Sequence, residues 1–234
     1  MAHIPWEYKE ELYKVAEYTP LRKQALFHHS KAKHRVVAGG NRGGKTECLA
    51  MEILPYLMWP NTAGWVVTKI YDLSEPLKEK LINVLIYKLG HKQVDSAGML
   101  AIGEFNWNER FHILTMWTGS TLTFKSAENP DSLHAKRLDY VIIDEGSLFP
   151  GILYDTRLVP RLVDTGGWIA SGGTFEYLQG DWFVDYFEVG QAYPNQYDVQ
   201  SWSLPTTENP HIDRERLKQE ERRLCRTEEG KRIY

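Results

Sequence analysis

Apolar residues recur at two spacings along the chain, and these predict two kinds of element. The apolar positions of residues 74–89 share one helical face, whereas residues 140–143 form a short continuous apolar run typical of a buried strand. Thr19-Pro20 is predicted to begin a helix, since Thr is a common N-cap and Pro fits the first turn. Helices are predicted over residues 8–16, 19–29, 46–57, 74–89 and 213–224, and strands over residues 35–38, 65–68, 140–143, 168–171 and 197–202.

Residues 102–124 alternate between apolar and polar positions, and Thr118-Gly119-Ser120 has the composition of a turn, which predicts an antiparallel hairpin. Elsewhere strands alternate with helices, as in a mostly parallel sheet covered on both faces. Ligands of such sheets bind at the carboxyl ends of the strands. The segments that follow Ala38, Ile143 and Ser171 are therefore expected to meet at one edge.

The composition limits the class of protein but does not indicate a function. The chain has 234 residues, a net charge of -3 and a pI of about 6.3, so no global basic charge indicates a nucleic-acid binder. The charge is nevertheless uneven, because residues 19–46 contain no acidic residue but seven basic ones. Cys48 and Cys225 suggest neither a disulfide framework nor a metal site. No stretch approaches the 18 apolar residues of a membrane span.

A glycine-rich loop follows the first predicted strand. It matches G-x-x-x-x-G-K-[ST], in which glycines let successive backbone N–H groups point at phosphate oxygens. Lys45 would reach the outer phosphates, and the Thr46 hydroxyl would bind Mg²⁺. The alternative is a glycine turn before an ordinary helix. The predicted ATP-binding residues of the loop are Gly39, Gly40, Asn41, Arg42, Gly43, Gly44, Lys45 and Thr46.

An acid pair, Asp144-Glu145, follows the apolar run at residues 140–143. Asp144 would hold hydrated Mg²⁺, and Glu145 would polarise the attacking water as general base. The alternative is an acidic turn after a strand. With the glycine loop upstream, the pair indicates a site for both ATP and Mg²⁺, and Glu145 favours hydrolysis over transfer.

Two further side chains, those of Arg42 and Gln24, each have two possible interpretations. Arg42 would either stabilise γ-phosphate charge in the transition state, as a catalytic group beside Glu145 and Lys45, or pair with an acid to hold the loop. Gln24 would either read the adenine edge with its amide or be an exposed helix residue.

Taken in order, these segments resemble the ATPase domain of the large terminase subunit of tailed bacteriophages. The adenine-side segment is matched by Tyr18-Thr19-Pro20, Gln24 and Phe27-His28. The Walker A strand and loop match residues 35–46, and the approach to Walker B matches residues 129–133 and 138–145. Residues 167–174 resemble the coupling motif, and Glu208-Asn209-Pro210 resembles a short motif near the domain end.

The resemblance implies an α/β P-loop NTPase fold of the ASCE type, with a mostly parallel central sheet, flanking helices and a hairpin near residues 100–125. It implies one ATPase domain over residues 1–234, with N-terminal helices at 1–34, a core at 35–205 and a helical extension at 206–234. A coupling role is implied for Ser171, Gly172, Gly173 and Thr174.

The implied function is ATP hydrolysis that drives viral double-stranded DNA into a procapsid. The implied partners are double-stranded DNA, the portal protein and a small terminase subunit, with a homo-oligomeric ring in the host cell cytoplasm and no membrane contact. Two other functions stay open: a helicase-like or other DNA-translocating ATPase, and a nucleotide-dependent structural module with negligible turnover alone.

The sequence departs from the family pattern at two places. The family often has Leu-Arg-Gly before Walker B, and that arginine acts on a neighbouring subunit's ATP; here Lys136 or Arg137 would take this role. The coupling motif usually has Thr-Pro, whereas this chain has Thr174-Phe175. Large terminases usually carry a C-terminal nuclease domain, which would begin near Tyr234, so nuclease activity is not expected of these residues.

Overall fold

The computed structural model describes residues 3–40, 42–95, 98–133, 137–175, 181–194, 196–215, 218–219 and 222. Its centre is a nine-stranded sheet in the order β3-β4-β5-β6-β2-β7-β8-β1-β9. The strands are β1 His34–Ala38, β2 Ala63–Thr68, β3 Lys92–Gln93, β4 Glu104–Asn108, β5 Ile113–Met116, β6 Thr121–Ser126, β7 Tyr140–Ile143, β8 Trp168–Gly173 and β9 Val199–Ser203.

Most neighbouring strands are parallel, which confirms the predicted sheet. Among the strand pairs of the described residues, only β4–β5 and β5–β6 are antiparallel. They form the predicted hairpin near residues 100–125, with Gly119 in the turn at a φ of 79°. In the parallel part, β8 lies between β7 and β1, and its Ser171 is level with Ile143 on one side and Val36 on the other. The carboxyl ends of these three strands therefore meet.

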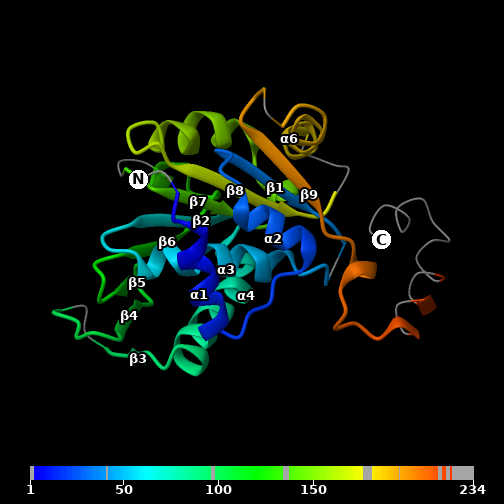
Figure 1. The fold of residues 1–234 in the computed structure, drawn as a ribbon. Coiled ribbons are helices and arrows are strands. Elements are labelled where there is room, and N and C mark those ends of the chain that lie inside the picture. The colour runs from blue at the N-terminus through cyan, green and yellow to red at the C-terminus, as the bar shows by residue number, and fades with distance from the viewer. Residues whose placement is uncertain are drawn as a thin grey trace.

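Helices cover both faces of the sheet (Figure 1). On one face lie α1 Trp6–Val15, α2 Arg22–His29, α3 Lys45–Met58 and α4 Glu75–Asn83; on the other lie α5 Gly151–Leu153 and α6 Asp181–Ala192. Short 3₁₀ segments span Tyr71–Ser74, Pro130–Leu133, Gly146–Leu148, Val159–Arg161 and Thr206–Glu208, and π-helical turns span Val84–Lys88 and Tyr154–Leu158.

Alternate residues of the central strands pack on opposite faces, because successive side chains of a strand point to opposite sides. Val37, Val66 and Ile142 join the core beneath α3, while Val141 and Ile143 pack with Phe149 and Leu158 on the other face. With both faces buried, these strands are continuous apolar runs rather than alternating ones, as their sequence indicated.

The predicted start of α2 needs correction, and α6 was not predicted. α2 begins at Arg22 rather than at Thr19, since the Gln24 side chain accepts the Leu21 N–H at 2.8 Å and caps the helix there. α6 was missed: its aromatic and branched residues favour strands, but Phe183 packs on β1 beside Val36. Half of the residues of the helix predicted over residues 213–224 lie outside the described residues.

Candidate functional site

Three segments predicted to meet do meet at one edge of the sheet. The glycine loop follows β1, the acid pair follows β7, and Thr174 follows β8 between them. The Gly39 N–H donates to the Gly173 carbonyl at 3.2 Å, which ties the loop to the end of β8. Gly173 in turn approaches the backbone after the acid pair, since a Cβ added there would lie 3.1 Å from the Gly146 nitrogen.

The segment that follows β9 packs closely against the glycine loop. The Leu204 N–H donates to the Ala38 carbonyl at 2.7 Å, which brings the Leu204 carbonyl against the loop. A Cβ added at Gly39 or Gly43 would lie 2.0 Å or 2.1 Å from that oxygen. Gly44 needs glycine for another reason, because its φ is 84°. Leu204 had no motif to reveal it in the sequence.

Replacing Gly43 by alanine is expected to weaken nucleotide binding at least tenfold, because the new methyl group and the Leu204 carbonyl cannot occupy the same space. Isothermal titration calorimetry with an ATP analogue measures this. Gly166→Ala is the control, since nothing lies within 4 Å of a Cβ there and only its φ of 64° is strained. Wild-type affinity in Gly43→Ala would contradict the packing role of Leu204.

The Lys45 side chain forms hydrogen bonds to the glycine loop. Its ammonium donates to the carbonyls of Gly39 and Gly40 at 2.9 Å each and to the Thr174 hydroxyl at 3.3 Å. Burial lowers the pKa of Lys45, and the nearby carboxylates of Glu145 and Asp144 partly offset this. The Thr174 hydroxyl also donates to the Gly39 carbonyl at 3.1 Å. Lys45 therefore connects the loop to the end of β8; Asn41 lies outside the described residues.

Asp144 is buried, with 3% of its surface exposed. Burial and the neighbouring Glu145 raise the pKa of Asp144 to about 7, against the Glu145 N–H, the charge of Lys45 and a hydrogen bond from Thr46. The side chains of Asp144 and Thr46 are thus hydrogen-bonded to each other. Glu145 has a φ of 54°, which is uncommon for a residue with a side chain and costs backbone energy. This backbone holds two successive carboxylates at one strand end.

Arg42 and Arg137, the two arginines for which the sequence suggested a role, lie at the surface. Arg42 is exposed, and among the described residues its side chain forms no ion pair with an acidic residue. The Asn209 amide donates to the Arg42 carbonyl at 2.7 Å, which ties the segment at Glu208-Asn209-Pro210 to the loop. Arg137 donates to the Asp164 carbonyl at 3.3 Å. Lys136 lies outside the described residues.

The four residues predicted to couple occupy the end of β8 and its exit. Ser171 is buried within the sheet, and Gly172 packs on α3, since a Cβ there would lie 2.7 Å from Leu49 Cδ1. Gly173 and Thr174 contact the loop as described above. The segment therefore contacts the glycine loop and the backbone after the acid pair at once.

Gln24 is buried rather than exposed, so the reading as an exposed helix residue is wrong. Its Nε2 donates to the Gly44 carbonyl at 3.2 Å, and its Oε1 accepts the Leu21 N–H. It lines a cavity of about 210 Å³ beside the loop together with Tyr18 and Gly44. The cavity has the position that a base would need if phosphates bound the loop.

A buried charge cluster lies behind this cavity, which we call the Glu52 cluster (Lys9, His28, Arg35 and Glu52). Glu52 Oε1 accepts from Lys9 at 2.6 Å and from Arg35 at 2.7 Å, and Oε2 lies 2.7 Å from His28 Nδ1. Arg35 also stacks on Trp168 of β8, 3.7 Å from the ring centroid. The cluster was not predicted from the sequence, although an acidic residue among the apolar residues of a buried helix was a signal.

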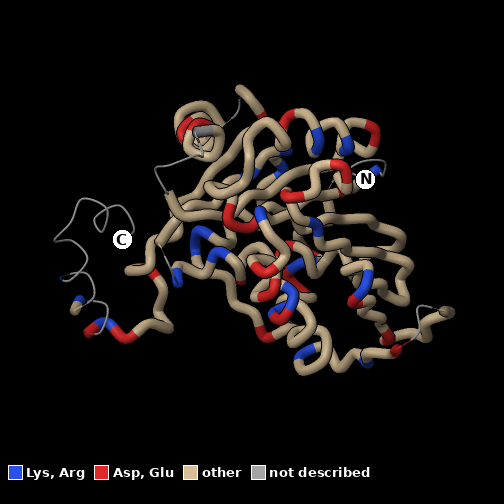
Figure 2. The backbone as a smooth tube through the Cα atoms, turned by 180° about the vertical axis from the view of Figure 1, so that it is seen from behind, with Lys and Arg blue, Asp and Glu red and all other residues tan. Residues whose placement is uncertain are grey.

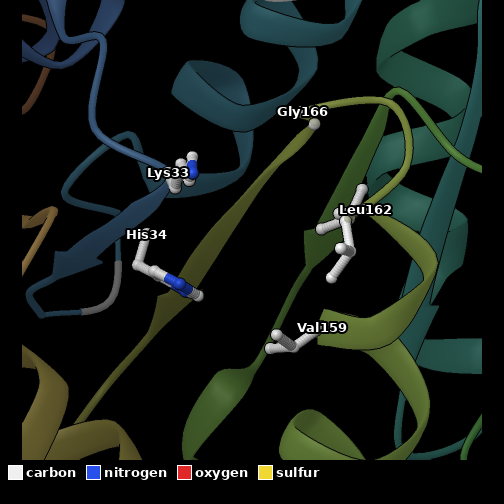
Figure 3. A pocket seen from close by; sticks show the side chains of 7 residues that line it. Lys33, His34, Val159, Leu162 and Gly166 are labelled. Carbon is white, nitrogen blue, oxygen red and sulfur yellow. The ribbon is translucent and has the colours of Figure 1, made fainter.

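A second cavity, of about 260 Å³, lies at the opposite end of the sheet (Figure 3). It adjoins the start of β1, where His34 Nδ1 lies 2.6 Å from the Tyr154 hydroxyl, and its wall includes Val159, Leu162 and Gly166. It lies at the amino end of β1 and is separate from the glycine loop, so it does not enter the site.

The sheet order, the loop and the position of β8 between β1 and β7 define a P-loop NTPase fold of the ASCE type. The family model for the terminase large subunit, T4likevirus-type, N-terminal, matches residues 36–155, just over half of the chain. The chain belongs to this family of phage terminase large subunits.

Similar proteins support this family assignment. The large terminase subunit of Thermus phage G20c is 24% identical over 188 residues, which are 77% of this chain and 38% of that protein. The chain thus spans about two fifths of this curated relative. The large terminase ATPase domain of Thermus phage P74-26 superposes with a TM-score of 0.76 at 23% identity, over 96% of each chain. A large terminase from a thermophilic bacteriophage, solved with ADP, has a TM-score of 0.64 at 13% identity, over 91% of this chain and 52% of that one.

Proposed function

We propose that the chain binds and hydrolyses ATP to drive translocation of viral double-stranded DNA into a procapsid. The observation that carries the proposal is the contact of Lys45 with both the glycine loop and Thr174, beside Asp144 and Glu145. Lys45 would exchange its two carbonyl partners for the outer phosphates of ATP, and the loop N–H groups would bind phosphate oxygens. The solved relative with ADP supports nucleotide binding.

The donor set suits Mg²⁺. Asp144 and Thr46 offer two hard oxygen ligands in contact with each other, and Mg²⁺ takes one or two protein ligands beside water and phosphate oxygens. When bound, the ion would neutralise charge on the transferred phosphoryl group. Its charge would also favour ionised Asp144, whose pKa burial has raised.

Glu145 would accept the proton of the attacking water. Its left-handed backbone turns the chain directly after Asp144. Arg42 would stabilise γ-phosphate charge from its exposed position in the loop, while Arg137 or Lys136 would serve a neighbouring subunit's ATP. Residues 171–174 would sense the phosphate, because Lys45 donates a hydrogen bond to Thr174 as well as to the glycine loop.

The family membership supports DNA as the translocated substrate, with a ring of subunits, the portal protein and a small terminase subunit as partners in the host cell cytoplasm. Figure 2 shows Lys and Arg interspersed with Asp and Glu along the backbone of the described part of the chain. Among the described residues, no helix has the length and apolarity of a membrane span.

Steady-state phosphate release, measured with and without duplex DNA, tests the proposal. We expect Mg²⁺-dependent release that duplex DNA changes. Nucleotide binding without any turnover, even at high protein concentration where neighbouring subunits meet, would instead support the structural module. Unwinding of a forked duplex would support a helicase-like motor, because a packaging motor moves intact duplex.

A further inference from the structure

Arg42 adopts a backbone conformation that its residue type disfavours. Its φ is 66°, in the left-handed region, and the Gly43 N–H donates to the Gly40 carbonyl at 3.1 Å. Arg42 is thus the third residue of a four-residue turn, a position where positive φ normally selects glycine or asparagine. A long charged side chain at such a position costs backbone energy, so the surrounding structure has to stabilise it.

A stabilising contact comes from a residue far away in the sequence. The Asn209 amide donates to the Arg42 carbonyl at 2.7 Å, across 167 residues of chain. Asn209 Oδ1 accepts the His211 N–H at 3.0 Å. An N–H needs an oxygen acceptor, so this second bond fixes the orientation of the amide and leaves Nδ2 facing Arg42. Asn209 is therefore a hydrogen-bond donor with a fixed direction.

Asn209 is itself held in place by its own segment. Its N–H donates to the carbonyl of the buried Thr206 at 3.2 Å, at the end of a 3₁₀ turn. The preceding Glu208 pairs with Lys23 of α2 at 2.7 Å, although this pair is partly exposed and contributes little. Earlier in the segment, Leu204 packs on the glycine loop as described above. The amide thus reaches Arg42 from a position that several contacts determine.

The backbone, rather than an ion pair, orients the Arg42 side chain. Among the described residues, no acidic side chain pairs with its guanidinium. The direction in which Cβ leaves the loop is set by φ, because rotation about the N–Cα bond moves Cβ relative to the preceding loop N–H groups. If the turn relaxed to the usual negative φ, the guanidinium and the loop N–H groups would no longer be aimed at the same place.

We propose that Asn209 is a positioning residue for ATP hydrolysis: it stabilises the left-handed backbone of Arg42, so that the guanidinium meets the charge that develops on the transferred phosphoryl group. The inference rests on the proposed function. Asn209 acts through the Arg42 carbonyl rather than on the nucleotide. The segment at Glu208-Asn209-Pro210 thereby becomes part of the catalytic arrangement, although it lies at the other end of the chain from the loop.

Binding of a transition-state analogue tests the inference without turnover. Dissociation constants are measured in Mg²⁺ for ADP alone and for ADP with aluminium fluoride, an anion that mimics the transferred phosphoryl group. Their ratio is the analogue preference. In Asn209→Ala we expect this preference to fall about tenfold, the size of effect that loss of a hydrogen bond produces. ADP affinity should stay within about threefold, because ADP has no γ-phosphoryl group for Arg42 to contact.

A second background separates positioning from a general loosening of the loop. Arg42→Gly removes the guanidinium, and glycine adopts a φ of 66° without strain, so the turn is kept. In this background Asn209→Ala should change the analogue preference by less than about twofold, since no guanidinium is left to position. An equal loss in both backgrounds, or a loss of ADP affinity as large as the loss of analogue affinity, would show a purely structural role and overturn the inference.

Asn83→Ala is the matched control, since it makes the same change at an exposed position of α4. It should keep the wild-type analogue preference, and a wild-type preference in Asn209→Ala would overturn the inference. A wild-type protein that binds ADP but gains no affinity from aluminium fluoride would also overturn it, while leaving nucleotide binding intact. Absence of binding of both ADP and ATP by the wild type would overturn the proposed function itself.

Discussion

Replacing Glu145 by glutamine is expected to slow ATP hydrolysis by about 10²–10⁴-fold and to leave ATP affinity within about twofold of the wild type. Glutamine has the shape of glutamate but cannot accept a proton from water. The left-handed backbone at this position is the same for both residues, so the substitution removes the base without adding strain. Single-turnover phosphate release measures the rate, and equilibrium binding of labelled ATP measures the affinity.

Glu188→Gln is the control, since it makes the same change on the exposed side of α6. Its hydrolysis rate should equal that of the wild type. Near-normal hydrolysis in Glu145→Gln would assign the proton to another group and would leave Asp144 as the only functional member of the acid pair. A matched loss of ATP binding would instead point to Glu145 as a residue that binds nucleotide.

Replacing Glu52 by alanine is expected to lower the free energy of unfolding by about 3–5 kcal/mol. Lys9 and Arg35 would keep two buried positive charges without a carboxylate, and the side chains of both cations are almost wholly inaccessible to solvent. A typical domain is stable by only about 5–15 kcal/mol, so the loss is a large part of the total. Urea unfolding followed by tryptophan fluorescence measures it.

Glu10→Ala tests the same chemistry at the surface. Glu10 pairs with Lys14 one helical turn away, and both side chains are largely exposed, so this pair should contribute under about 1 kcal/mol. A small effect of Glu52→Ala, comparable to that of Glu10→Ala, would mean that water reaches the cations.

Much of the site was predictable from local sequence. The glycine loop between β1 and α3 has its own spacing, and the acid pair follows an unbroken apolar run, so both could be placed at strand ends. The same run predicted a strand buried on both faces. These features need only neighbouring residues, because hydrophobic periodicity and loop chemistry are local properties.

Other features depend on residues distant in sequence. The burial of Gln24 was not predicted, because the Gly44 carbonyl that it binds lies 20 residues away in the sequence. Leu204 presses on Gly39 and Gly43 only because β9 lies beside β1 in the sheet. Strand order is a tertiary property that no local pattern contains.

The sequence by itself therefore determined the phosphate-binding loop, the acid pair and a parallel sheet to carry them, since each follows from residues adjacent in the chain. Only the tertiary structure decided that β8 lies between the loop and the acids, that Thr174 and Lys45 meet there, and that Glu52 joins Lys9, His28 and Arg35 behind the base cavity. Buried charges and backbone contacts need partners from several elements, and these come together only when the sheet and its helices pack.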